Sequence, residues 1–444
     1  MYFSSTRISR RIAIVPFVLV VLFAAAHSAL AQTETETVLY SFGLQSVDGA
    51  TPWDSLIMDK EGNLYGTTEQ GGEYGFGTVF ELSPPAEKRG VWVETVLYSF
   101  GSQSEDGVNP YDSLVMAKDG SLYGTTYAGG ANNVGTVFQL SRKKGVWTET
   151  VLYGFGSAPN DGSLPYARLV IDKNGNLYGT TYTGGANNLG TVFELSPPVV
   201  EGGAWAETVL HAFGGAPNDA SLPYAGLVVD KKGNLYGTTN EGGAYSFGSV
   251  FKLSLPAEKG GAWTETVLYS FGSQSGDGVN PFGSLIMDKK GNLYGTTTGG
   301  GAYFYGEVFK LSCAEESGAW AETVLYSLGS YSVDGAYPFD GLTMDKEGNL
   351  YGTTTGGGKY SFGTVFEMSP PAKNGDAWTE TVLYSFGRQS KNGEEPWDSL
   401  IMDKEGNLYG TTTEGGATTN CDYGCGTVFK LSPEKGKAQT EAVL

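Results

Sequence analysis

Acidic side chains recur at a fixed place along the chain and are the first candidates for chemistry. The recurrent positions are Asp48, Asp106, Asp161, Asp219, Asp277 and Asp334, with Asn392 at the seventh. Carboxylates in this pattern could ligate calcium or supply the acid pair of a glycoside hydrolase or lyase. The alternative is an Asx turn, in which the side chain bonds nearby backbone donors. Sevenfold repetition favours the turn, because a catalytic pair would appear once and a calcium loop would carry several acids at alternating positions.

An aromatic residue follows a proline a few positions after each of these acids. The seven aromatic residues are Trp53, Tyr111, Tyr166, Tyr224, Phe282, Phe339 and Trp397. Aromatic faces suit the C–H surfaces of sugars, and Trp and Tyr add a polar group. We therefore expect these residues to be ligand-binding and to ring the mouth of a central channel. The alternative is that they only pack between structural repeats.

Other reactive groups are scarce. His211 replaces a tyrosine found in other repeats and is interpreted as a packed strand residue. The chain offers neither a G-x-S-x-G motif nor the several His or Cys ligands of a zinc site. We expect no metal and no cofactor, and the sequence identifies no catalytic residue. Glu307 stands where other repeats carry Thr or Ser, and an enzymatic alternative would use it together with a loop aspartate.

A repeated word positions all of these residues. The word "NLYGTT" or a near-copy places tyrosines at 65, 123, 178, 236, 294, 351 and 409, which are 55 to 58 residues apart. Each unit contains four strand-like runs, exemplified by Ser55–Asp59, Asn63–Thr68, Thr78–Leu82 and Trp92–Phe100. Four strands in each of seven units predict an all-β, seven-bladed β-propeller of antiparallel blades. A mid-strand glycine such as Gly66 indicates close approach by a neighbouring backbone or ring.

The two ends of the chain predict a closed ring. Thr35–Phe42 is the fourth strand of a unit whose first three strands occur only at 399–431. This N-terminal strand can complete the last blade and remove an open edge. Thr440–Leu444 is a truncated copy of the same strand and could compete for that place. Residues 32–444 are therefore expected to form a single propeller domain.

The first 31 residues are expected to be a signal peptide. Three arginines precede the apolar run Ile12–Ala26, and Ala29–Ala31 forms an A-x-A cleavage site. The protein is thus predicted to be secreted or periplasmic, an oxidising setting in which Cys421 and Cys425 should form a disulfide and leave Cys313 unpaired. The net charge of −20 disfavours nucleic acid and anionic lipid as partners. We expect no membrane insertion and a monomer.

The stretch from Pro52 to Leu82 resembles the Gloeobacter–Verrucomicrobia tandem repeat of exported bacterial proteins. The resemblance rests on "GNLYGTT", the following "GG" and "GTVF", and it extends over essentially the whole chain after residue 31. It implies export and a propeller-like fold, and it implies nothing about a substrate.

These observations favour an exported, non-enzymatic propeller that binds a glycan or an extracellular protein on the face built from its "GG" and "DG" loops. A polysaccharide-active hydrolase or lyase that uses carboxylates is the second hypothesis. A purely structural cell-surface repeat protein is the third.

Overall fold

The computed structural model describes residues 34–53, 55–87, 90–200, 202–258, 260–314, 317–373, 376–387, 392–418 and 420–433. They all belong to one compact unit that spans residues 32–444. The expected signal peptide and the Thr440–Leu444 copy lie outside the described residues. Among the described residues, no helix is long and apolar enough to cross a membrane.

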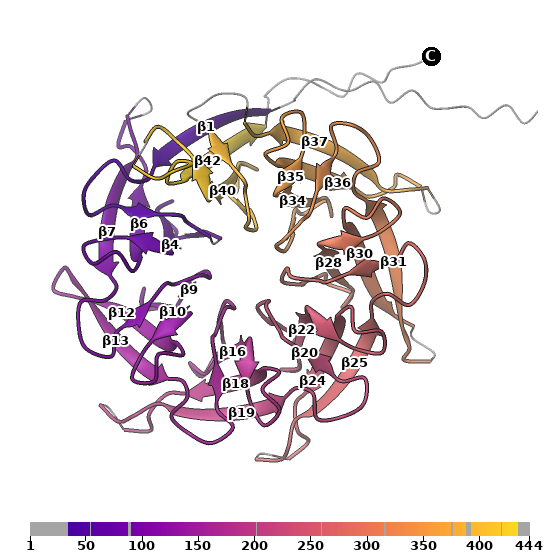
Figure 1. Ribbon diagram of the computed structural model, residues 1–444, viewed down its shortest axis with the longest axis horizontal. Helices are drawn as coiled ribbons and strands as arrows, with labels where there is room; N and C mark the ends of the chain where they lie inside the picture. The colour runs from indigo at the N-terminus through magenta and orange to yellow at the C-terminus, as the bar shows by residue number, and fades with distance from the viewer. Residues whose placement is uncertain are drawn as a thin grey trace, which may run out of the picture. The chain divides into compact units, whose positions relative to one another are not determined.

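The described chain forms seven four-stranded antiparallel blades arranged in a ring (Figure 1). The innermost strands are β3 (Ile57–Met58), β9 (Val115–Met116), β15 (Val170–Ile171), β21 (Val228–Val229), β27 (Ile286–Met287), β33 (Thr343–Met344) and β39 (Ile401–Met402). The second strands are β4 (Leu64–Thr68), β10 (Leu122–Thr126), β16 (Leu177–Thr181), β22 (Leu235–Thr239), β28 (Leu293–Thr297), β34 (Leu350–Thr354) and β40 (Leu408–Thr412). We number the blades 1 to 7 in this order.

The outer half of each blade is longer. The third strands are β6 (Thr78–Ser83), β12 (Thr136–Lys143), β18 (Thr191–Ser196), β24 (Ser249–Ser254), β30 (Glu307–Cys313), β36 (Thr364–Ser369) and β42 (Thr427–Pro433). The outermost strands of blades 1 to 6 are β7 (Val93–Ser99), β13 (Val146–Gly154), β19 (Ala206–Ala212), β25 (Thr264–Ser270), β31 (Trp320–Ser327) and β37 (Thr379–Ser385).

Blade 7 takes its outermost strand from the start of the chain, as the sequence predicted. β1 (Glu34–Ser41) pairs antiparallel with β42, from Glu34 opposite Pro433 to Ser41 opposite Thr427. Figure 1 shows this indigo strand beside the yellow strand β42. The pairing joins the two ends of the described chain and gives blade 7 its fourth strand.

Seven two-stranded ribbons add a feature that the sequence analysis treated as loops. Each ribbon pairs the "DG" segment before a blade with the "GG" segment after that blade's second strand, which places both loops on one side of the molecule. The ribbons are β2 (Gly49–Ala50) with β5 (Gln70–Gly71), β8 (Gly107–Val108) with β11 (Ala128–Gly129), β14 (Gly162–Ser163) with β17 (Thr183–Gly184), β20 (Ala220–Ser221) with β23 (Glu241–Gly242), β26 (Gly278–Val279) with β29 (Gly299–Gly300), β32 (Gly335–Ala336) with β35 (Gly356–Gly357), and β38 (Gly393–Glu394) with β41 (Glu414–Gly415).

The innermost strands are shorter than expected. The sequence predicted a strand over Ser55–Asp59 that is buried on both faces, but β3 contains only Ile57 and Met58, and both are half-buried. The strand ends where Asp59 turns back on the chain. Its carboxylate accepts bonds from the backbone N–H of Asn63 at 2.8 Å and from the Asn63 side chain at 2.7 Å. This network forms the turn after the strand. The two-residue length does not depend on it, because β9 is equally short although Ala117 replaces the aspartate there.

A glycine and two phenylalanines form the contact between neighbouring blades. The ring of Phe80 lies so close to Gly66 that a Cβ at Gly66 would come within 2.7 Å of it, which confirms the expected close approach. Phe42 of blade 7 packs edge-on against Phe80 of blade 1, with ring centroids 5.1 Å apart. Both phenylalanines are fully buried. Such edge-to-face pairs add stabilisation beyond the area they bury.

The same contact occurs at the other junctions between blades. The equivalent pairs are Phe100–Phe138, Phe155–Phe193, Phe213–Phe251, Phe271–Phe309 and Phe386–Phe429, each with centroids 5.1 or 5.2 Å apart. Leu328 replaces the first phenylalanine at the junction of blades 5 and 6, and it is also fully buried.

The packing predicts how much the closing strand contributes to stability. Replacing Phe42 by Ala should lower the free energy of unfolding by about 3–5 kcal/mol, because it removes a buried aromatic ring and leaves a cavity. Phe100→Ala is the matched control in blade 1 and should destabilise by a similar amount. Chemical denaturation measures both. A Phe42→Ala variant as stable as the wild type would show that β1 does not close the ring in solution.

Candidate functional site

The seven aromatic residues singled out in the sequence meet in one closed circuit. Neighbouring ring centroids are 4.3–6.1 Å apart all the way around, and the circuit closes between Trp397 and Trp53 at 4.8 Å. Every one of the seven side chains is half-buried. They therefore pack against one another, as the alternative interpretation required, and still present part of each ring to solvent. We call this set the aromatic circuit.

A strained backbone residue positions each member of the circuit. The residue two positions before each aromatic is left-handed, with φ between 55° and 60°, and these residues are Thr51, Asn109, Leu164, Leu222, Asn280, Tyr337 and Glu395. For Leu164 the N–H donates to the carbonyl of Val134 in the preceding repeat at 2.8 Å. Its own carbonyl accepts from the N–H of Tyr182 at 3.0 Å. A left-handed leucine is energetically unfavourable, and such strain is concentrated at functional sites.

Glu69 is a functional candidate that the sequence analysis missed. Its two carboxylate oxygens accept hydrogen bonds from two circuit members, from Trp53 Nε1 at 2.6 Å and from the Tyr111 hydroxyl at 2.7 Å. Glu69 directly follows "NLYGTT", and the equivalent residues are Tyr127, Tyr182, Asn240, Thr298, Thr355 and Thr413. The glutamate at this position differs from the residues of the other repeats, and the sequence shows that difference. Its contact with Tyr111 could not be seen there, because Tyr111 lies in the next repeat.

Two of those equivalent residues extend the circuit into a cluster of tyrosines. Tyr127 lies 5.4 Å from Tyr111 and 4.7 Å from Tyr166 between ring centroids. Tyr182 lies 5.7 Å from Tyr166 and 4.8 Å from Tyr224. Burial raises the pKa of Tyr111, Tyr166 and Tyr224. Glu69 raises the pKa of Tyr111 further, and Tyr224 and Tyr127 raise that of Tyr166. These hydroxyls remain protonated at ordinary pH and can donate hydrogen bonds.

The "GG" loops on the same side carry further aromatic residues. The most exposed are Phe304 at 79% and Tyr423 at 74%. In blades 2 and 3 asparagines replace them, and Asn132 and Asn187 donate to the carbonyls of Phe155 and Phe213 at 3.0 and 2.9 Å. The tyrosine cluster thus lies in the sector where the surrounding loops lack large side chains.

The recurrent aspartates have a structural role. The Asp48 carboxylate accepts from the Tyr40 hydroxyl at 2.9 Å and from the N–H of Leu44 at 3.1 Å. The same tyrosine-to-aspartate bond occurs for Asp106, Asp161, Asp277 and Asp334 at 2.8–3.0 Å. The preference for a loop-stabilising role is therefore supported by the geometry, and the tyrosine is a partner that the sequence did not reveal.

Each of these aspartates also faces a glutamate of an outermost strand. In blade 2, Asp106 and Glu149 each have one buried carboxylate oxygen without a hydrogen-bond donor. Burial, and then the charge of Asp106, raise the pKa of Glu149 to about 8. The same two causes raise the pKa of Glu94 and Glu207 to about 7, beside Asp48 and Asp161. The propeller therefore contains repeated acid pairs that disfavour full ionisation.

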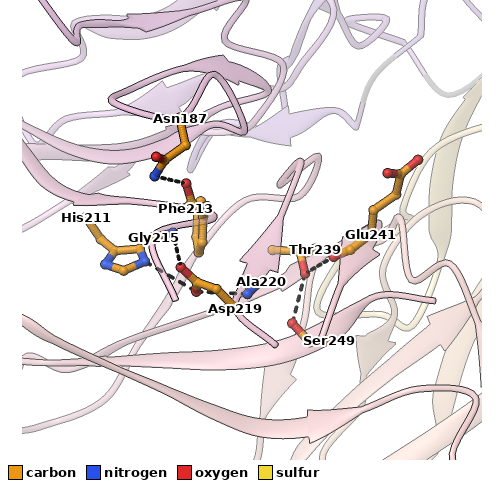
Figure 2. Close-up of polar contacts among 9 residues, drawn as sticks. All are labelled: Asn187, His211, Phe213, Gly215, Asp219, Ala220, Thr239, Glu241 and Ser249. Carbon is orange, nitrogen blue, oxygen red and sulfur yellow. Dashed lines mark hydrogen bonds and ion pairs between the residues drawn. The ribbon is translucent and has the colours of Figure 1, made fainter. Parts of the chain in front are cut away.

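His211 modifies one of these pairs. Its Nε2 lies 3.7 Å from Asp219 Oδ1, as Figure 2 shows. The aspartate also accepts from the N–H groups of Gly215 at 2.8 Å and Ala220 at 2.9 Å. Burial alone would raise the pKa of Asp219, but the contacts with His211 and Gly215 lower it overall. His211 takes the place of the usual tyrosine, which agrees with its interpretation as a packed strand residue.

Glu307 does not have the role that the enzymatic hypothesis required. The residue has no exposed surface. A polysaccharide chain cannot reach a carboxylate that is closed off from solvent, so the hydrolase or lyase hypothesis loses the residue on which it rested.

Two hollows lie on the opposite side from the circuit, among the turns of the inner hairpins. One has a volume of about 1080 Å³ and includes Lys346, Lys404 and Trp378. The other has a volume of about 1030 Å³ and includes Lys173, Lys231 and Trp263. Both are broad grooves between neighbouring blades, edged by solvated lysines and acids. We favour the aromatic circuit as the site, because its polar groups converge on an aromatic surface.

The extended loop of the last repeat contains a disulfide. Cys421 and Cys425 are bonded, with Cα atoms 5.3 Å apart, and Cys313 is free and exposed. Cys425 is buried beside Phe42 in the core of blade 7. The disulfide fixes this loop next to the closing strand.

The acid pairs predict an unusual dependence of stability on pH. Because the folded pKa of Glu149 is raised, the pair destabilises the folded state as pH rises from the unfolded pKa toward about 8. Glu149→Gln should stabilise the protein by about 1–2 kcal/mol at pH 8.5, since solvent screening weakens the full effect. The gain should vanish near pH 4.5.

Thermal unfolding of both proteins from pH 4.5 to 8.5 measures this difference. The exposed Glu61→Gln is the control and should change little at any pH. A Glu149→Gln variant that is less stable than the wild type at pH 8.5 would contradict the unfavourable acid pair.

Several solved structures resemble this chain at low sequence identity. A candidate 6-phosphogluconolactonase from Bacteroides uniformis is 12% identical, with a TM-score of 0.47 over 79% of this chain and 97% of that one. A candidate oxidoreductase (glucose dehydrogenase) from Thermus thermophilus is 14% identical, with a TM-score of 0.40 over 90% and 99%. The extracellular domain of a candidate hybrid two-component system from B. thetaiotaomicron is 13% identical, with a TM-score of 0.49 over 90% and 39%. These similarities carry no argument about activity.

Sequence comparison identifies the family. No curated protein matches the chain significantly. The Gloeobacter/Verrucomicrobia repeat matches it twice, at residues 26–216 and 200–389. These matches cover most of the chain and agree with the resemblance seen in its repeated word, so the chain belongs to the Gloeobacter/Verrucomicrobia repeat family.

Proposed function

We propose that this propeller is an exported binding protein that holds a glycan on the aromatic circuit. The observation that carries the proposal is the closed circuit of seven half-buried aromatic rings with a carboxylate held at its edge by Trp53 and Tyr111. Sugar rings present C–H groups to aromatic faces and hydroxyls to polar groups. The circuit offers both kinds of contact within one surface.

The tyrosine cluster and Glu69 define the part of the circuit that would contact the sugar most specifically. The hydroxyls of Tyr166 and Tyr224 are donors at ordinary pH, and the Glu69 oxygens are acceptors. The loops of blades 2 and 3 carry asparagines in place of large aromatics, which leaves the middle of this sector accessible, and the loops of blades 1 and 4 add exposed aromatics at its two ends. We therefore expect the ligand to lie over blades 1 to 4.

The charge of this side favours a neutral glycan. Several ribbon residues and their neighbours on this side are acidic, namely Glu69, Glu241, Glu394, Glu395 and Glu414. The whole chain carries a formal charge of −20. Like charges disfavour close approach of uronic acids or sulfated sugars. A neutral oligosaccharide meets no such penalty.

A glycan array with the purified protein tests the proposal, followed by calorimetry with the best neutral oligosaccharide. Trp53→Ala and Trp397→Ala should each weaken binding by about 1–3 kcal/mol, because each removes an aromatic anchor. Lys60→Ala and Lys404→Ala, on the opposite side, should leave the affinity unchanged.

The other hypotheses give different outcomes in the same assays. Released product would support a hydrolase or lyase, and binding to an extracellular protein but to no sugar would support the protein-ligand alternative. No binding to either would favour a structural role. Loss of glycan binding in Lys404→Ala, with Trp53→Ala unaffected, would place the site in the opposite hollow.

A further inference from the structure

Blade 5 departs from the other blades at one buried position. The third strand of the other six blades begins with a hydroxyl residue, namely Thr78, Thr136, Thr191, Ser249, Thr364 and Thr427. In each of these blades its hydroxyl lies 2.7–2.9 Å from the hydroxyl of the last threonine of the second strand. Figure 2 includes one such pair, Thr239 and Ser249. In blade 5, Glu307 occupies this position opposite Thr297.

The Glu307 carboxylate is buried without a well-formed hydrogen bond, and the polar groups that face it are the Gly278 backbone and the Glu322 carboxyl group. Glu307 has no exposed surface, and neither of its carboxylate oxygens has a hydrogen-bond partner. A buried carboxylate without a partner is strongly unfavourable. The contact around Gly278 is also close, because a Cβ there would lie 2.5 Å from Glu307 Oε1. The side chain is thus held beside the ribbon that precedes blade 5.

Two further carboxylates face Glu307. Asp277, Glu307 and Glu322 each offer an oxygen within 4.8 Å of the others. Asp277 Oδ1 and Glu322 Oε1 are also buried and without a partner. The Tyr269 hydroxyl and the Ser273 N–H hold the other oxygen of Asp277 at 3.0 and 2.7 Å, which fixes the direction of its free oxygen. Three carboxylates therefore face one another, and each has at least one buried oxygen without a hydrogen-bond partner.

No basic side chain compensates this charge. Among the described residues, none of these three carboxylates forms an ion pair, whereas in the neighbouring junction His211 lies 3.7 Å from Asp219. The oxygens of blade 5 must therefore share protons or bind a cation.

We propose that Asp277, Glu307 and Glu322 form a calcium site between blades 4 and 5. Calcium accepts carboxylate oxygens at 2.3–2.6 Å, so two of its ligands lie at most about 5 Å apart, which the separation of these oxygens satisfies. An all-oxygen ligand set suits a hard cation and disfavours zinc. Magnesium retains several waters, for which a site without exposed surface at Glu307 has little room. The half-buried Glu322 leaves a route for entry.

The ion would tie three separate segments together. Asp277 precedes the ribbon strand β26, Glu307 begins β30 and Glu322 lies in β31. Binding would thereby fasten the loop that connects blade 4 to blade 5 onto the outer half of blade 5. The expected role is structural, and the site is independent of the aromatic circuit.

Calcium binding to the chelator-stripped protein tests the proposal. Mass spectrometry of metals should find one calcium per chain after equilibration with millimolar CaCl2, and calcium should raise Tm. Glu307→Thr restores the residue type of the other blades. It should lose the bound calcium and the calcium-dependent rise in Tm, and without metal it should have a higher Tm than the stripped wild type. Glu322→Gln should also lose calcium.

Control variants in other blades test whether calcium binds at this site or at the equivalent acidic groups. Glu94→Gln removes one carboxylate of the equivalent pair in blade 1 and should keep full calcium binding. His211→Tyr alters the neighbouring His211–Asp219–Glu265 group and should do the same. Absence of calcium from the wild type would overturn the proposal in favour of shared protons. Retention of calcium in Glu307→Thr, or its loss only in His211→Tyr, would equally overturn it.

Discussion

The rest of the structure depends on one repeated contact. In it, one phenylalanine packs onto a strand glycine, and a second phenylalanine packs onto the first. A four-stranded blade has two apolar faces and cannot bury both alone. Gly66 lets Phe80 lie flat over its own blade, and Phe42 of the previous blade then packs on that ring. This contact repeats around the ring and joins seven blades that would each be unstable alone. The closing strand β1 matters because it supplies Phe42.

A scaffold fixed in this way allows single repeats to change without loss of the fold. The variations are concentrated where they alter chemistry and leave the phenylalanine contact in place. Glu69 adds a carboxylate to the aromatic circuit, and Tyr127 and Tyr182 extend it. His211 takes the place of a tyrosine beside one acid pair, and Glu307 adds a third acid to another. A symmetric ring thereby acquires an asymmetric face and a candidate ion site.

The repeat predicted most of the fold because its information is local. The period, the four strand-like runs, the mid-strand glycine and the split last unit led to seven closed blades. The predicted length of the innermost strands was wrong, because apolar composition does not fix where strand pairing begins and ends. The pairing covers two residues in blade 1 and also in blade 2, where Ala117 replaces the aspartate of the turn. The circuit was predicted from its spacing, but Glu69 with Tyr111 and Asp106 with Glu149 were not. Glu69 and Tyr111 are 42 positions apart in neighbouring repeats, and Asp106 acts on Glu149 across a similar separation along the chain. A short sequence motif does not contain such contacts.

Intrinsic fluorescence tests most directly the claim that the aromatic circuit is the working surface. Trp53 and Trp397 lie in the circuit, whereas Trp263 and Trp378 line the two hollows on the other side. A neutral glycan that binds the protein should change the emission of the wild type. A Trp53→Phe, Trp397→Phe double variant should lose that change while calorimetry still detects weaker binding. An unchanged fluorescence response in the double variant would place the ligand in a hollow and contradict the account.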